Sequence, residues 1–298
     1  VLGKEHPHTA TTFSHMTLVC SAQYDYAKAL KYAEKAMHIY ERVYGKEHPY
    51  AATAYNNIAV AYSEQSNYPK ALEYNEKAIA IRERVYGKDH PDTATSYSNI
   101  AMVYRGQGNY VKALEYNEGA IVIRKKMLGD KHPDTATNYN NIALVYSDQG
   151  DYAKALKCYR KALVICKKIL GKKHLHTAAT YSNIASVYSD QGDYAKAIKH
   201  YKEALEIDVK LRGKEHFLTA TTYNNLAKVC YNQGDYAKAI EYYAEALAIC
   251  EKILGKEDPH TVVTYNNLAG VYEQLGDHTT ALEYIKKALG EHPPEDRQ

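Results

Sequence analysis

The sequence lacks the features that mark membrane proteins and strongly charged binding proteins. No apolar run approaches the roughly 18 to 20 residues that a membrane-spanning helix needs, and the first residues do not resemble a secretory signal peptide. The chain has 38 basic and 35 acidic residues, so its formal net charge is only +3. This balance gives no electrostatic reason to expect nucleic acid or an anionic membrane as a partner.

Cysteine is scarce, and the cysteines do not form a recognisable pattern. The five residues are Cys20, Cys158, Cys166, Cys230 and Cys250. Their number is odd, and their spacing fits no zinc-binding motif. Cys20 and Cys230 occupy a position where most repeats carry a core tyrosine, so we expect buried thiols there rather than redox-active ones. No Asn-x-Ser/Thr glycosylation site occurs either, and together these absences predict a reducing, cytoplasmic setting.

What the sequence does contain is a strict internal period. A glycine recurs every 42 residues, without an insertion or deletion over six periods, at Gly3, Gly45, Gly87, Gly129, Gly171, Gly213 and Gly255. A fixed period between about 20 and 50 residues is typical of stacked repeat arrays. We therefore predict a single array of seven repeats over 1–298, with repeats at 3–44, 45–86, 87–128, 129–170, 171–212, 213–254 and a truncated 255–290, followed by a tail at 291–298.

The first two residues also fit this period. Val1-Leu2 resembles Ile169-Leu170, the end of the second helix of a repeat. We therefore expect that the chain begins inside a longer array or protein.

Each repeat is predicted to form two helices joined by a tight turn. In the fourth repeat, a histidine precedes Pro133 at the expected start of the first helix, where proline is favoured. The apolar stripe of this helix falls within about 100° on a helical wheel and consists of Tyr139, Ile142, Ala143 and Tyr146. The second helix follows Gln149-Gly150-Asp151 and repeats large and small residues at steps of three and four, including Tyr152, Ala155, Tyr159 and Ala162.

This arrangement of large and small residues resembles the tetratricopeptide repeat (TPR). The length of 42 residues and the phrase Tyr-Asn-Asn-Ile/Leu-Ala, found at Tyr139–Ala143, Tyr223–Ala227 and Tyr265–Ala269, are similar to the repeats of kinesin light chains and nephrocystin-like proteins. The resemblance implies an all-α solenoid of about fourteen helices that forms a right-handed superhelix. It also implies that the first helices line a concave groove. The amino-terminal heptad region of kinesin light chains is missing.

No pattern indicates an enzyme, a metal site or a cofactor site. The linker histidines could form a metal series, but equivalent positions in stacked helices lie about 10 Å apart, whereas zinc needs ligands about 2 Å from one ion. We therefore favour helix capping or loop packing for these histidines. Gly106-Gln107-Gly108 lacks the third glycine of a phosphate-binding loop and follows a helix. No nucleophile motif is present.

One polar register stands out on the first helices. Six repeats place an amide there, at Asn57, Asn99, Asn141, Asn183, Asn225 and Asn267, while His15 takes this place in the first repeat. This asparagine ladder lies opposite the apolar stripe, so the resemblance places it along the concave groove. Each amide offers two donors and two acceptors, enough to pair with the backbone of an extended peptide. The alternative is that each asparagine bonds the neighbouring repeat. Arg105 and Lys228 are further groove candidates.

The sequence therefore predicts a non-catalytic scaffold that binds an extended peptide segment of a partner protein in the concave groove. Two alternatives remain: a self-assembling array, with homo-oligomers formed through its ends, and a sensor or regulatory arm of a larger multidomain protein. Family members that clamp an acidic C-terminal tail carry Lys or Arg at the position of Thr137. Its absence here argues against that ligand.

Overall fold

The computed structural model describes residues 3, 5–22 and 25–291, and the regular structure in this part of the chain is entirely helical. The helices are α1 (Pro7–Ala22), α2 (Tyr26–Tyr44), α3 (Pro49–Glu64), α4 (Tyr68–Tyr86), α5 (Pro91–Gly106), α6 (Tyr110–Leu128), α7 (Pro133–Asp148), α8 (Tyr152–Ile165), α9 (Leu175–Asp190), α10 (Tyr194–Arg212), α11 (Phe217–Gln233), α12 (Tyr236–Ile253), α13 (Pro259–Gln274) and α14 (His278–Ala288). A π-helical turn, η1 (Cys166–Leu170), continues α8. The predicted all-α fold of fourteen helices is confirmed.

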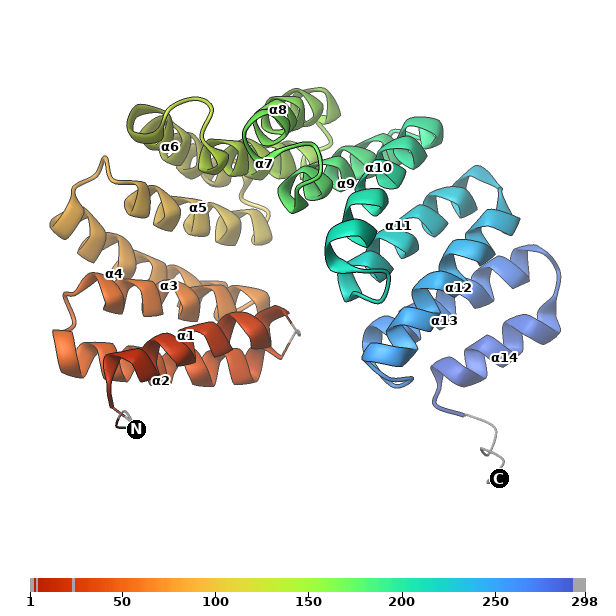
Figure 1. The fold of residues 1–298 in the computed structure, drawn as a ribbon, viewed down its shortest axis with the longest axis horizontal. Coiled ribbons are helices and arrows are strands. Elements are labelled where there is room, and N and C mark those ends of the chain that lie inside the picture. The colour runs from red at the N-terminus through yellow and green to blue at the C-terminus, as the bar shows by residue number, and fades with distance from the viewer. Residues whose placement is uncertain (1–2, 4, 23–24, 292–298) are drawn as a thin grey trace. The chain divides into compact units, whose positions relative to one another are not determined.

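The chain divides into two compact units, Val1–Ala162 and Leu163–Gln298, and the division falls within α8. Within each unit, consecutive helices lie side by side (Figure 1). The first helices α1, α3, α5 and α7 also contact one another in sequence in the first unit, as α11 and α13 do in the second. Val1, Leu2 and the predicted tail beyond Glu291 lie outside the described residues.

The first helices begin at the linker histidines, as the sequence predicts. The Nδ1 atom of His132 accepts a hydrogen bond from the backbone N–H of Asp134 at 3.2 Å, and His48, His90, His174 and His216 make the equivalent bond. Asp258 caps α13 in the same way. Because these bonds satisfy backbone donors that a helix leaves free, the histidines have a structural role at the helix starts.

The second helices begin at an aspartate or asparagine in every repeat. Asp151, for example, accepts from the backbone N–H of Lys154 at 3.1 Å. A hydrogen bond from the side chain of Lys154 also holds the pKa of this aspartate below its ordinary value. The helix start and the first charged pair of the second helix are therefore built from the same two residues.

The linker glycines end the second helices with a positive φ, as predicted. Gly129 has a φ of 92° and a ψ of 162°, and Gly87 has a φ of 86° and a ψ of 167°. The positive φ thus comes with an extended ψ rather than a left-handed helical one. This region of backbone conformation is open almost only to glycine.

The predicted apolar stripes form the core. Ile142 and Ala143 of α7 and Ala155 of α8 are buried, whereas Tyr146 is half-buried. Cys20 and Cys230 are buried, as the sequence predicts, and all five cysteines are unpaired. Burial raises the pKa of the Cys230 thiol.

Candidate peptide-binding face

The asparagine ladder lies on the first helices of both units and is half-buried. Asn57, Asn99 and Asn141 lie on α3, α5 and α7 of the first unit, and their counterparts lie on α9, α11 and α13 of the second. None of the six side-chain amides forms a hydrogen bond with another residue in the described ranges. They are thus partly desolvated polar groups whose bonding capacity is left for another molecule or for water.

The residue directly before the ladder makes the bonds between repeats. Asn56 is 5% exposed, and its amide lies 3.2 Å from the Ser96 hydroxyl of the next first helix. In the second unit, the amide nitrogen of Asn224 donates to Thr264 Oγ1 at 3.1 Å. The alternative interpretation of the ladder, an amide that bonds the neighbouring repeat, therefore describes these adjacent residues.

A pair of buried arginines, which the sequence analysis missed, joins three helices at a time in the first unit. Arg82 is 6% exposed. It donates to the Asp92 carbonyl at 2.9 Å, to Ser96 Oγ at 2.8 Å and to Thr53 Oγ1 at 3.4 Å. Burial lowers the pKa of its guanidinium. Arg82 therefore fixes α3, α4 and α5 through neutral acceptors.

Arg124 repeats this arrangement one repeat later. It donates to the Asp134 carbonyl, to Asn138 Oδ1 and to Thr95 Oγ1, and burial lowers its pKa as well. Thr53 and Thr95 lie one turn before the ladder residues Asn57 and Asn99 on the same helices. The arginines therefore hold the backbone on which the ladder is mounted.

The two basic groove candidates lie in different surroundings. Arg105 of α5 is already paired with Asp148 of α7, with N–O distances of 2.5 and 3.3 Å. Lys228 is exposed on α11. It favours the charged form of Asp190, whose pKa is raised because burial outweighs this attraction. Lys228 is therefore the more accessible of the two cations.

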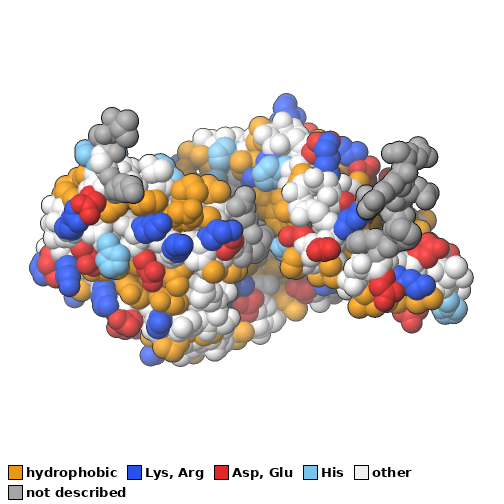
Figure 2. Space-filling view, turned by 90° about the horizontal axis from the view of Figure 1, so that it is seen from below, with side chains coloured by type: hydrophobic (Ala, Val, Ile, Leu, Met, Phe, Trp, Pro, Cys, Tyr) orange, Lys and Arg blue, Asp and Glu red, His pale blue; other side chains and the backbone are white. Residues whose placement is uncertain are grey.

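Apolar side chains accompany the ladder on the first helices. Val60 and Met102 lie three residues after Asn57 and Asn99, and both are exposed. On the face seen in Figure 2, charged side chains of both signs are interspersed with apolar ones. This agrees with the small net charge of the chain.

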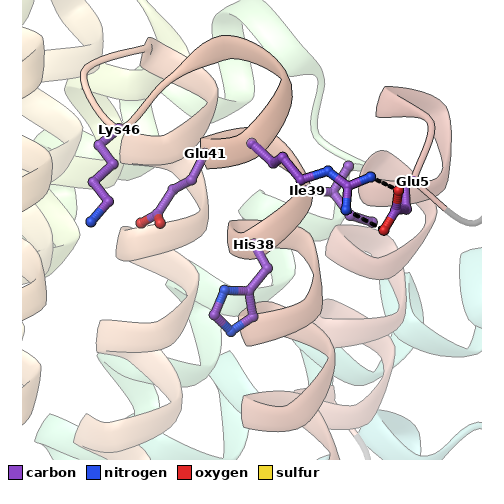
Figure 3. A pocket seen from close by; sticks show the side chains of 6 residues that line it. Glu5, His38, Ile39, Glu41 and Lys46 are labelled. Atoms are coloured by element: carbon purple, nitrogen blue, oxygen red, sulfur yellow. Dashed lines mark hydrogen bonds and ion pairs between the residues drawn. The ribbon is translucent and has the colours of Figure 1, made fainter.

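A shallow depression of about 390 Å³ lies away from the ladder, at the end of α2. Its lining comes from α2 and two linkers and consists of Glu5, His38, Ile39, Glu41, Arg42 and Lys46. Figure 3 shows the guanidinium of Arg42 paired with the carboxylate of Glu5 at one side of this depression. No ladder residue contributes to it.

Two further searches cover the described part of the chain. It contains no cluster of three or more histidine, cysteine, aspartate or glutamate side chains that could hold a metal ion. None of its helices combines the length and apolarity that crossing a membrane requires.

The fold and the ladder define a repeat protein made of stacked helix pairs. A family model described as tetratricopeptide repeat matches residues 8–84, 64–126, 96–168, 134–210 and 218–290, and a second model with the same description matches residues 182–252. The chain therefore belongs to the tetratricopeptide repeat family. No match is found among curated proteins.

Several solved structures are similar to this chain. BtubC (BKLC) from P. vanneervenii is 25% identical, with 78% of this chain and 95% of that chain covered and a TM-score of 0.65. A putative kinesin light chain from Podosopora anserina with nearly identical TPR-like repeats is 24% identical, with coverages of 70% and 99% and a TM-score of 0.56. The predicted likeness to kinesin light chain repeats is thereby confirmed.

A third similar structure belongs to a larger protein. It is a Signal Transduction ATPase with Numerous Domains (STAND) from Pyrococcus horikoshii that has a tetratricopeptide repeat sensor. It is 20% identical, and the match covers 96% of this chain but 42% of that chain, with a TM-score of 0.64. At this identity the likeness concerns the fold alone.

Proposed function

We propose that this chain is a non-catalytic scaffold that holds an extended peptide segment of another protein against the asparagine ladder. Tetratricopeptide repeat arrays are generally protein–protein interaction scaffolds, and both matching family models are of this kind. The unpaired cysteines fit a reducing compartment, so we place this scaffold in the cytoplasm.

The observation that carries the proposal is the contrast between two neighbouring positions. Asn56 and Asn224 use their amides to join repeats, whereas Asn57 and Asn225 do not bond another described residue. Asparagine lowers helix propensity by roughly 0.5 kcal/mol relative to alanine. An unused amide in the middle of six first helices thus has a small energetic cost that a ligand would offset.

The chemistry of the ladder favours a peptide backbone as the ligand. A primary amide can donate to a carbonyl and accept from an N–H group at the same time, which matches the groups that an extended chain presents. Exposed Val60 and Met102 would contact side chains of the ligand, and Lys228 would favour a carboxylate. Arg105 would bind an acidic group only in exchange for Asp148, so we rank it below Lys228.

The test begins with an array of short peptides, from which a binder of the first unit is selected. The double variant Asn57→Ala/Asn99→Ala should weaken its binding about ten-fold, because each lost hydrogen bond contributes about 0.5 to 1.5 kcal/mol. The same peptide with alternate backbone nitrogens methylated should bind as weakly to the parent protein. Replacing individual peptide side chains with alanine should have a smaller effect.

Two results would overturn the proposal. One is a double variant that binds the selected peptide as well as the parent does. The other is light scattering that shows a concentration-dependent oligomer dissolved by the same double substitution, which would assign the ladder to self-assembly.

A further inference from the structure

The repeats close on themselves through an ion pair that two central repeats replace with lysines. In the first, second, third and sixth repeats, a linker carboxylate pairs with a cation 37 residues later, near the end of the second helix. These pairs are Glu5 with Arg42, Glu47 with Arg84, Asp89 with Lys126 and Glu215 with Lys252. The fifth repeat has Lys173 and Lys210 at these two positions, and the fourth has Lys131 and Lys168. Four repeats of the same chain thus provide an internal reference for the exchange.

The exchange leaves uncompensated positive charge in the second unit. Residues 163–189 contain no aspartate or glutamate. Lys173 reaches Glu206 at 3.2 Å, and both side chains are exposed. Lys168, Lys172 and Lys210 are exposed and form no ion pair with any residue in the described ranges. We call Lys168, Lys172, Lys173 and Lys210 the lysine edge.

A second register changes sign next to this edge. Glu41, Glu83 and Glu251 accept a hydrogen bond from a tyrosine hydroxyl of the following first helix. Lys167 takes the same register, and its ammonium lies 4.7 Å from the centre of the Tyr181 ring. Positive charge therefore replaces negative charge at two positions of the same linker.

The lysine edge also has exposed apolar residues and an unusual backbone. Ile169 is 48% exposed and Leu211 is 47% exposed, and each directly follows a lysine of the edge. The turn that presents Lys168 and Ile169 is the π-helical segment η1, in which the Gly171 N–H donates to the Cys166 carbonyl five residues back at 3.0 Å. No other π-helical turn occurs in the described part of the chain. Single π-turns of this kind are frequent at functional sites.

We propose that the lysine edge binds an acidic segment of a partner protein in which aspartate or glutamate alternates with apolar side chains. Like charges at positions that elsewhere hold an ion pair destabilise the repeat unless an anion from outside neutralises them. Alternation of acidic and apolar residues would complement Lys168, Ile169, Lys210 and Leu211. The edge comprises second-helix ends and a linker, so this interaction is independent of the asparagine ladder.

The surroundings of the edge favour a protein over single-stranded RNA. Bases bind proteins largely by stacking on aromatic side chains. The exposed aliphatic residues Val43 and Val85 of the first two repeats are each followed by a tyrosine, Tyr44 and Tyr86. Ile169 and Leu211 are instead followed by Leu170 and Arg212. The edge thus offers charge and aliphatic surface without a stacking platform.

The test measures fluorescence anisotropy of a labelled peptide that alternates glutamate and leucine. Lys173→Glu restores the residue pattern of the first, second, third and sixth repeats, so it should leave the melting temperature no lower than that of the parent. It should weaken peptide binding roughly three- to ten-fold, because a charge at the rim of a contact is reversed. Binding should also weaken with added salt.

A matched control and a reciprocal variant make the test specific. Lys88→Glu alters an exposed linker lysine of the third repeat and changes the net charge equally, so it should leave binding unchanged. Glu215→Lys creates a further lysine doublet in the sixth repeat and should strengthen binding. If Lys173→Glu lowers the melting temperature, Lys210→Ala replaces it in the same comparison, and it should likewise weaken binding.

Three outcomes would overturn the proposal: no measurable binding of the glutamate–leucine peptide, equal losses in Lys173→Glu and Lys88→Glu, or tighter binding of oligouridylate than of the peptide. The last outcome would assign the edge to nucleic acid. None of these outcomes depends on the ladder, so the proposed function is tested separately.

Discussion

Two adjacent asparagines of α3 should respond in opposite directions to the same substitution. Asn56 is buried and lies within hydrogen-bonding distance of Ser96. When its amide oxygen faces Arg82, it accepts from that guanidinium at 2.6 Å and its nitrogen donates to Asn75 Oδ1 at 3.2 Å. Asn57 is half-buried and bonds no other described residue.

The magnitudes follow from these partners. Asn56→Ala removes an acceptor from a buried cation and leaves polar groups unpaired, which costs about 1 to 3 kcal/mol and exceeds the gain in helix propensity. Asn57→Ala removes no protein hydrogen bond and improves helix propensity by roughly 0.5 kcal/mol. The first variant should therefore unfold at a lower urea concentration than the parent, and the second at an equal or higher one.

Urea unfolding followed by circular dichroism gives the comparison. Hydrogen exchange of α3 and α5 should show that the loss in Asn56→Ala is local, since repeats of an array contact only their neighbours. Asn224→Ala and Asn225→Ala repeat the contrast in the second unit, where Asn224 bonds Thr264. If Asn57→Ala destabilises the chain as much as Asn56→Ala, the ladder amides are structural, and the main support for peptide binding is lost.

Three further predictions concern caps and thiols. Because the hydrogen bond from Lys154 lowers the folded-state pKa of Asp151, its stabilisation is present at neutral pH and is lost as the pH falls through that pKa; Asp151→Asn should reduce the acid sensitivity of the urea midpoint. Burial raises the pKa of Cys250 to about 11, so its thiol should react slowly with a disulfide reagent in mild alkali and rapidly once urea unfolds the chain. His132→Ala should cost about 1 kcal/mol by loss of the N-cap, as measured by urea melts, whereas His132→Asp should retain most of this stability because Asp258 caps α13.

The helices were predictable because their determinants recur at fixed positions. A linker glycine, a polar cap and large and small residues at steps of three and four appear in each repeat, so chance matches are improbable. Even the capping role of His132 followed from its position directly before Pro133. The extended ψ of the linker glycines did not, because a sequence indicates that a positive φ is needed but not which region is used.

The polar contacts between repeats were harder to predict. Asn56 and Asn57 are chemically identical and differ by about 100° around a helix, so only the packed structure shows which one bonds its neighbour. Arg82 resembles a surface residue in the sequence, and its partners Thr53 and Ser96 lie 29 and 14 residues away along the chain. The lysine edge became visible only after the ion pairs of the other repeats had identified its two registers.

The linker glycines have a consequence for the handling of this chain as a set of parts. Each segment of 42 residues begins at a glycine whose conformation ends the previous helix, and the residues that cap its own first helix follow at once. Stop and start signals therefore travel together within one segment. Cutting at Gly87 or Gly129 would release a cassette that carries its own punctuation, so whole repeats can be removed, duplicated or grafted without designing a new junction.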